Sequence, residues 1–182
     1  MEDCMGANDC MKKELEDYVT TLYRDIPTEV FEGLLSVLCL GGVVVIVFWG
    51  FRNGWRKIVG LALVEYVFLI YCSTVIYRMS SETRGHNFMP FWSYERPELM
   101  VENIMNVAVF VPVGILLGLA FRTMTFWKDL LIGVAISSSI ETMQFYFHRG
   151  FAETDDVMHN TVGCIIGCII VKSARFMVKG FI

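Results

Sequence analysis

The stretch GLLSVLCLGGVVVIVFWGF, residues 33–51, contains no charged side chain. A helix rises about 1.5 Å per residue, so about 20 apolar residues cross the hydrocarbon core of a bilayer. Four similar stretches follow, none with more than one acidic residue: 58–77, 104–121, 130–147 and 157–171, the last running on to about residue 178. Lipid offers the backbone no hydrogen-bond partner, so each stretch is expected to be helical. We therefore predict an all-α, polytopic membrane bundle with five transmembrane helices.

The composition of the whole chain supports a membrane protein. Among 182 residues, 55% are apolar, only 19% are charged, and the mean hydropathy is +0.53. Soluble domains carry about 25% charged residues, and disordered chains are far less apolar. The net charge of −4 also argues against nucleic acid as a partner. Membrane lipids are the expected surroundings of a multi-pass protein of this composition.

The charges of the connecting segments alternate along the chain. The segments 51–57, 122–129 and the tail from Lys172 onward are basic, whereas 1–32, 78–103 and 148–156 are acidic or mixed. Cytoplasmic loops of membrane proteins are enriched in lysine and arginine. This pattern predicts an N-terminus outside the cell and a C-terminus inside.

The segment that precedes the first span is acidic and has its own pattern. Residues 12–26 place apolar side chains on one face of a helix and charges on the other, which favours an interfacial helix. A helix that docks a partner is the alternative. Cys4 and Cys10 lie in this segment and could pair if that side of the membrane is oxidising.

Pairs of small residues four positions apart occur in the predicted spans. Gly114 and Gly118 form one such pair, and Gly163 and Gly167 form another. Glycine lets helix backbones approach closely in lipid, so these pairs favour tight helix packing.

Polar side chains gather at one level of the predicted bundle. Charged groups within a bilayer are costly and usually face the protein interior. Three spans and the connecting segment 148–156 carry such residues near the predicted outer end, and we expect them to form a single site: Asn103, Asn106, Glu141, Gln144, Arg149, Asp155, Asp156, His159 and Asn160. No spacing typical of a metal site is present, and we expect neither a metal nor a cofactor.

Each of these residues also has a structural interpretation. Glu141 could be a buried partner of Arg149 or a group that acts on a ligand, while Arg149 could also bind a phosphate or carboxylate. Asp155 or Asp156 could cap the last span, and His159 could simply lie at the interface. The two adjacent aspartates point about 100° apart on a helix, so only one is expected to share a site with Glu141.

Three blocks follow one another in the sequence: HNFMPF at 86–91, NIMNVAVFVPVG at 103–114 and the stretch 141–167. Together they resemble the VanZ-like membrane proteins. The stretch ETMQFYFHRGFAETDDVMHNTVGCIIG, residues 141–167, is similar to that family's E-x-x-Q, R-x-F-x-x-x-D and N-x-x-G pattern. HNFMPF at 86–91 and NIMNVAVFVPVG at 103–114 resemble two further family blocks. The resemblance covers about residues 58–175. Its signature positions include every residue of the polar set named above except His159, and five more: Asn87, Pro90, Pro112, Gly114 and Gly163.

The resemblance implies an organisation and a function. It divides the chain into an acidic tail (1–32), an extra span with a basic loop (33–57) and a VanZ-like four-helix domain (58–178). It implies a protein of the bacterial plasma membrane that contributes to teicoplanin-type resistance. The polar site would bind a lipid head group, a lipid-linked cell-wall precursor or a lipoglycopeptide. The alternative is a membrane enzyme that hydrolyses or transfers groups on a lipid-linked substrate.

Overall fold

The computed structural model describes residues 12, 13, 16, 20, 26–80, 85–121 and 125–180, without the side chains of residues 52, 53, 179 and 180. Cys4, Cys10 and most of the predicted amphipathic helix at 12–26 lie outside the described residues. Within them, five helices are long and apolar enough to cross a membrane: Thr28–Phe51, Gly54–Ile76, Pro97–Ala120, Phe126–Phe147 and Thr154–Val178. The prediction of an all-α bundle with five spans is therefore confirmed.

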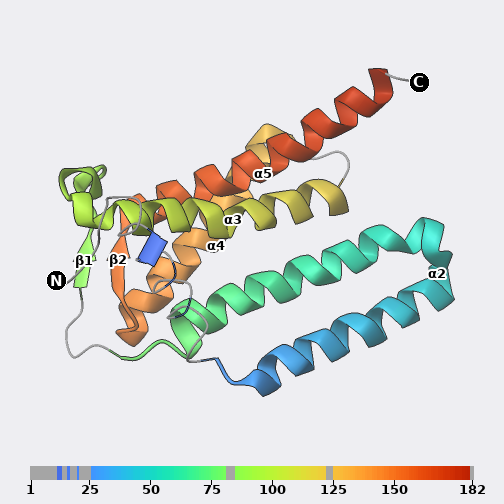
Figure 1. The fold of residues 1–182 in the computed structure, drawn as a ribbon, viewed down its shortest axis with the longest axis horizontal. Helices are drawn as coiled ribbons and strands as arrows, with labels where there is room; N and C mark the ends of the chain where they lie inside the picture. The colour runs from blue at the N-terminus through green and yellow to red at the C-terminus, as the bar shows by residue number, and fades with distance from the viewer. Residues whose placement is uncertain are drawn as a thin grey trace.

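The first two spans form a helical hairpin, labelled α2 (Thr28–Tyr71) in Figure 1. The hairpin turns at Gly50, whose φ of 68° and ψ of 157° interrupt the helix. Glycine takes positive φ without the steric cost that a Cβ brings. The second arm continues into a π-helical turn, η1 (Cys72–Ile76), and docks on α3 through the Tyr66 hydroxyl, which donates to the Val109 carbonyl at 3.0 Å.

Helix α3 (Met100–Ala120) packs against this second arm, and α4 (Phe126–Phe147) meets its η1 turn. Helix α5 (Thr154–Gly180) packs against α3 and α4. The core between them is apolar and consists of Ile70, Val75, Phe110, Val113, Leu117, Ile140, Cys164 and Cys168. Many large apolar side chains on the outside of the bundle are exposed, as expected for surfaces that face lipid.

The backbones of α3 and α5 approach each other closely at the paired glycines. A Cβ built on Gly114 would lie 2.8 Å from the carbonyl carbon of Cys164, and one on Gly163 would lie 2.9 Å from that of Val107. A Cβ on Gly167 would lie 2.7 Å from the Ile115 nitrogen. The tight packing expected from the G-x-x-x-G pairs is therefore confirmed.

One end of the bundle carries a small sheet that the sequence pattern did not predict. Strand β1 (Gly85–Asn87) pairs in parallel with β2 (Phe151–Glu153), so that His86 lies opposite Ala152. Two 3₁₀ turns, η2 (Trp92–Glu95) and η3 (Pro97–Leu99), complete this end, which lies at the left in Figure 1.

The two ends of the bundle differ in charge. Acidic residues such as Glu102, Glu153 and Asp156 lie at the end with the sheet, while Arg56, Lys172 and other basic residues lie at the opposite end. We refer to these as the acidic end and the basic end. The separation agrees with the charge pattern of the loops, and the side of the membrane that each end faces stays a prediction.

Candidate functional site

Three helices bring polar side chains to one small cavity at the acidic end. Each helix contributes a carboxylate and an amide about one turn apart, a spacing that places both on one helix face. These pairs are Glu102 and Asn106 of α3, Glu141 and Gln144 of α4, and Asp156 and Asn160 of α5. The cavity has a volume of about 40 Å³ and is polar enough to hold ordered water. We call these six residues the polar cluster.

Hydrogen bonds from two asparagines join the helices around this cavity. Asn106 Nδ2 donates to Asp156 Oδ1 at 2.6 Å and so links α3 to α5. Asn160 Nδ2 donates to the Ser137 hydroxyl at 2.8 Å and links α5 to α4. Hydrogen bonds of this kind between membrane helices contribute about 0.6 kcal/mol each. The bond from Asn106 also holds the Asp156 carboxylate, which lines the cavity.

Gln144 connects the cluster to the end of the second span. Its Nε2 donates to the Thr74 carbonyl at 3.2 Å. Thr74 lies in η1, where the backbone is wound more widely than in an α-helix, and Tyr77 N donates to Cys72 O at 2.9 Å. π-helical turns are rare and frequently occur at functional sites.

Arg78 supplies the cation of the cavity. It follows η1 directly and lines the cavity together with Glu102, Glu141 and Asp156. Its charge acts on both Glu141 and Asp156. A Cβ on Gly150 would lie 3.1 Å from the Arg78 guanidinium carbon, so the absence of a side chain at position 150 leaves room for that group.

Arg149 was expected to supply the guanidinium of the site, but its side chain does not line this cavity. Helix α4 ends at His148, which has φ 55°, and Arg149 N turns back to donate to Gln144 O at 2.8 Å. This left-handed cap directs the Arg149 side chain to the backbone carbonyl of Arg78, to which its guanidinium donates a hydrogen bond. Arg149 therefore supports the segment that carries Arg78, and Arg78 lines the cavity.

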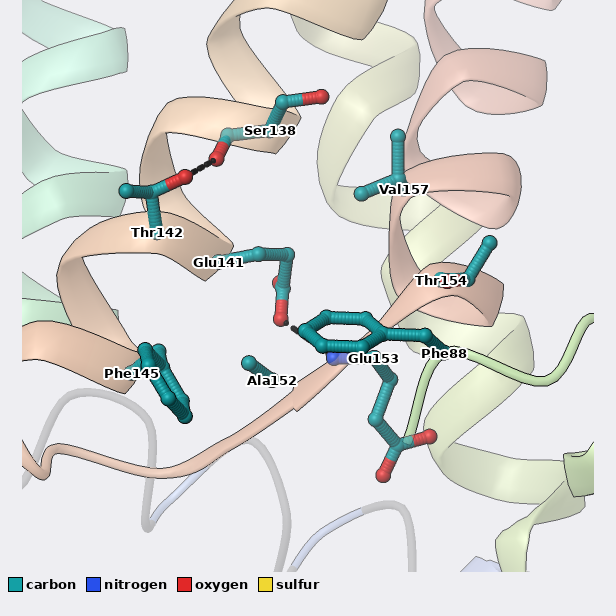
Figure 2. Close-up of a pocket in the computed structure, with 9 residues that line it drawn as sticks. All are labelled: Phe88, Ser138, Glu141, Thr142, Phe145, Ala152, Glu153, Thr154 and Val157. Carbon is teal, nitrogen blue, oxygen red and sulfur yellow. Dashed lines mark hydrogen bonds between the residues drawn. The ribbon is translucent and has the colours of Figure 1, made fainter. Parts of the chain in front are cut away.

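A larger cavity adjoins Glu141 on its other side. It has a volume of about 360 Å³, and its walls are largely apolar, with Phe88 and Phe145 on two sides. Figure 2 shows the Glu141 carboxylate directed at the backbone of Glu153, whose N–H donates to Glu141 Oε2 at 3.0 Å. Glu141 is only 8% exposed and lines both cavities, so it forms the boundary between the polar cluster and an apolar chamber.

Glu153 is the second carboxylate of this chamber and lies outside the spans. Burial raises its pKa to about 7, although the Trp92 indole N–H, which donates to Glu153 Oε2 at 2.9 Å, acts in the opposite direction. The negative charges of Glu102 and Asp155 raise the pKa further, and the charge of Arg96 lowers it. Glu153 is therefore a carboxyl group that exchanges its proton near neutral pH.

The raised pKa of Glu153 makes the stability of this end depend on pH. The protonated form fits the folded protein better, so this contribution is complete below pH 4.5 and is lost as the pH rises through about 7. We expect the thermal midpoint of the wild type in detergent to fall over this range by more than that of Glu153→Gln. Glu95→Gln, at an exposed position, should retain the wild-type slope. Equal slopes for wild type and Glu153→Gln would contradict the assignment.

Asp155 points away from Asp156 and holds the neighbouring loop. It is fully buried, and its two carboxylate oxygens accept three hydrogen bonds: from Phe91 N at 2.6 Å, from Ser93 N at 2.9 Å and from Ser93 Oγ at 2.6 Å. Phe91 has φ 67°, so these bonds fix an unusual loop conformation. Asp155 is thus a structural residue, and only Asp156 shares the cavity with Glu141.

Asn103 and His159 lie beside the polar cluster and line a different cavity of about 470 Å³. Asn103 Nδ2 donates to Ser93 Oγ at 3.2 Å, and His159 Nε2 is 2.8 Å from the Tyr94 hydroxyl. Both side chains therefore hold the loop that Asp155 anchors.

Of the nine predicted site residues, five line the small cavity: Asn106, Glu141, Gln144, Asp156 and Asn160. The sequence reasoning missed Glu102, Arg78 and Glu153. Glu102 could have been found from its position one turn before Asn106 on the same face. Within the described residues, no three His, Cys, Asp or Glu side chains are grouped to hold a metal ion.

Comparison with known proteins identifies the family of this chain. A family model described as VanZ/LLP1 matches residues 35–177, which include all five spans in whole or large part. The chain belongs to the VanZ/LLP1 family. Its five apolar helices and this family membership make it a multi-pass protein of the bacterial plasma membrane.

One relative is similar to this chain over most of the relative's own length. Protein VanZ of Enterococcus faecium is 27% identical over 115 residues, which are 62% of this chain and 70% of that protein. No solved structure matches. The family match runs from the first span to the last, and the polar cluster lies within it.

Proposed function

We propose that the acidic end binds the polar head group of an amphiphile, either a lipid-linked cell-wall precursor or a lipoglycopeptide. The observation that carries this proposal is the position of Glu141 between the polar cavity and the apolar chamber. A molecule with a hydrophilic head and an acyl chain has the two chemistries that these adjoining spaces offer. By sequestering or excluding such a molecule, the protein would contribute to teicoplanin-type resistance.

The chemistry of the polar cluster limits the head groups that fit. Carboxylates accept hydrogen bonds only, so Glu141 and Asp156 favour hydroxyl or amine groups. Arg78 is the cation at the same cavity and would pair with a phosphate or carboxylate of the ligand. Cell-wall precursors and glycopeptides carry both kinds of group, which supports them over a simple neutral lipid.

A binding titration tests the proposal. We expect purified protein in detergent to bind fluorescent teicoplanin, which has an acyl chain, more tightly than vancomycin, which has none. Glu141→Gln should raise Kd about 10-fold or more, because a hydrogen bond to a charged group contributes about 1.5–3 kcal/mol. Arg78→Gln should weaken binding similarly.

Glu98→Gln is the matched control, because Glu98 is an exposed acid at the same end. It should leave Kd unchanged. Equal affinity of wild type and Glu141→Gln for teicoplanin, or no preference over vancomycin, would count against lipoglycopeptide binding.

In cells, deletion of the gene should change sensitivity to teicoplanin and leave sensitivity to vancomycin unchanged.

The second candidate function is a membrane enzyme that acts on a lipid-linked substrate. The observation that favours it is Glu153, a carboxyl group with a pKa of about 7 that lines the same chamber as Glu141. Such a group suits general acid–base catalysis near neutral pH. The test is the rate of turnover of a labelled lipid-linked substrate as a function of pH. A rate that changes with a midpoint near pH 7, and that is lost in Glu153→Gln, would favour an enzyme over a binding protein.

A further inference from the structure

Another large cavity lies at the basic end, opposite the polar cluster. It has a volume of about 740 Å³ and lies between the second arm of α2, the end of α3 and the C-terminal half of α5. Figure 1 shows the turn of the α2 hairpin, the end of α3 and the C-terminal half of α5 toward the right. The head-group site proposed above does not include any residue of this cavity.

The charges that line this cavity are positive. Arg56, Lys172 and Arg175 are its charged lining residues, and no acidic residue is among the described side chains of its wall. Lys172 forms an ion pair with Asp129, a buried residue of α4, so its charge is balanced. Arg56 and Arg175 therefore leave an excess of two positive charges at the wall.

Both arginines are held in place while keeping donors for a ligand. Arg175 Nη2 donates to the Gly118 carbonyl at 2.6 Å, at the end of α3. The Arg56 guanidinium carbon lies 5.3 Å from the centre of the Trp55 ring. A guanidinium has five N–H donors, so each side chain can still donate to an anion. Held arginines bind phosphate with less loss of conformational entropy than free ones.

The rest of the wall is apolar and faces the region of the lipid tails. Ile115 and Leu119 come from α3, and Ile170 comes from α5, where its side chain is 49% exposed. These residues belong to spans, so a molecule in the cavity can extend its chains along them into the bilayer. The cavity thus has an anion-binding end and an apolar side.

We propose that this cavity binds an anionic membrane phospholipid, with its phosphate between Arg56 and Arg175 and an acyl chain along Ile115, Leu119 and Ile170. Basic cavities between spans on the cytoplasmic side are known to take anionic head groups. The charge pattern of the loops predicts that the basic end faces the cytoplasm, where anionic lipids are abundant. This site is independent of the head-group site at the acidic end.

Native mass spectrometry of the full chain tests the proposal. The protein in detergent is mixed with phosphatidylglycerol or phosphatidylcholine vesicle lipid, and retained lipid is counted. We expect the wild type to retain phosphatidylglycerol in preference, and Arg56→Gln to reduce this retention about fivefold, which corresponds to the contribution of one basic residue near a membrane surface. Arg56→Gln with Arg175→Gln should remove the preference.

Two further variants separate a site from a general charge effect. Lys57→Gln with Lys128→Gln removes the same charge from exposed positions at the same end, outside the cavity, and should keep the preference. Ala174→Trp, which fills part of the cavity and keeps every charge, should lower phosphatidylglycerol retention. Loss of the preference in the lysine variant, or full retention in Ala174→Trp, would overturn the proposal. Equal retention of both lipids by the wild type would do so as well, and would favour a protein partner at this surface.

Discussion

Replacing Gly114 with alanine is expected to cost about 3 kcal/mol or more of stability. The added Cβ would lie 2.8 Å from the carbonyl carbon of Cys164 and 2.9 Å from Cys168 N, both backbone atoms of α5. Backbone atoms in a helix cannot give way as a flexible side chain can, so α3 and α5 would have to separate. That separation would also disturb the core around Val113 and the asparagine that links α3 to Asp156.

Thermal unfolding in detergent, followed by circular dichroism, measures this effect. Gly60→Ala is the matched control, because it adds the same methyl group to a span where a Cβ meets nothing within 4 Å. Gly60→Ala should be neutral or slightly stabilising, since alanine favours a helix more than glycine does. If Gly114→Ala unfolded at the same temperature as wild type, the close approach of α3 and α5 would be refuted.

Asp155→Asn is expected to release the loop that covers the acidic end and to cost about 3 kcal/mol. Both Asp155 oxygens accept N–H or O–H donors from Phe91 and Ser93. An asparagine offers only one oxygen, and its amide group would face a donor. At least one buried N–H would then lack an acceptor, although the shape of the side chain is nearly unchanged.

Hydrogen exchange gives a local measure of this loss. The amides of Phe91 and Ser93 should exchange much faster in Asp155→Asn, while amides in the centre of α3 should keep their wild-type rates. Glu98→Gln changes an exposed acid in the same loop and should leave both amides protected. Wild-type protection of Phe91 and Ser93 in Asp155→Asn would show that this aspartate does not hold the loop.

Much of the fold follows from hydropathy and small-residue spacing. The apolar stretches predicted all five spans, and the G-x-x-x-G pairs that contain Gly114 and Gly163 predicted tight helix packing, although not which helices would pair. Both signals are local, because span length and the absence of a side chain act through the backbone of one helix. The strands β1 and β2 were not predicted, since each has three residues and its partner lies more than 60 positions away.

The candidate site was predicted in its helical part and not in its loops. Glu141 and Asn160 could be placed because helical spacing fixes which residues share a face. Arg149 was assigned to the site in place of Arg78 because the sequence does not reveal the left-handed cap at His148, which redirects the following residue. The different roles of Asp155 and Asp156 depend on a loop whose course no periodic pattern specifies.

The most direct test of ligand binding at the acidic end is photo-crosslinking in native membranes. A photoreactive amino acid at Phe88, an exposed residue on the wall of the chamber beside Glu141, would capture the occupant for mass spectrometry. The same amino acid at Leu40, an exposed residue of the first span, would report ordinary membrane lipid. We predict that position 88 captures a species that is not found at position 40, an acylated molecule with hydroxyl or amine groups, and that Glu141→Gln abolishes the capture of this species. The same captured molecules at both positions, or capture at position 88 that is unaffected by Glu141→Gln, would contradict a head-group site at Glu141.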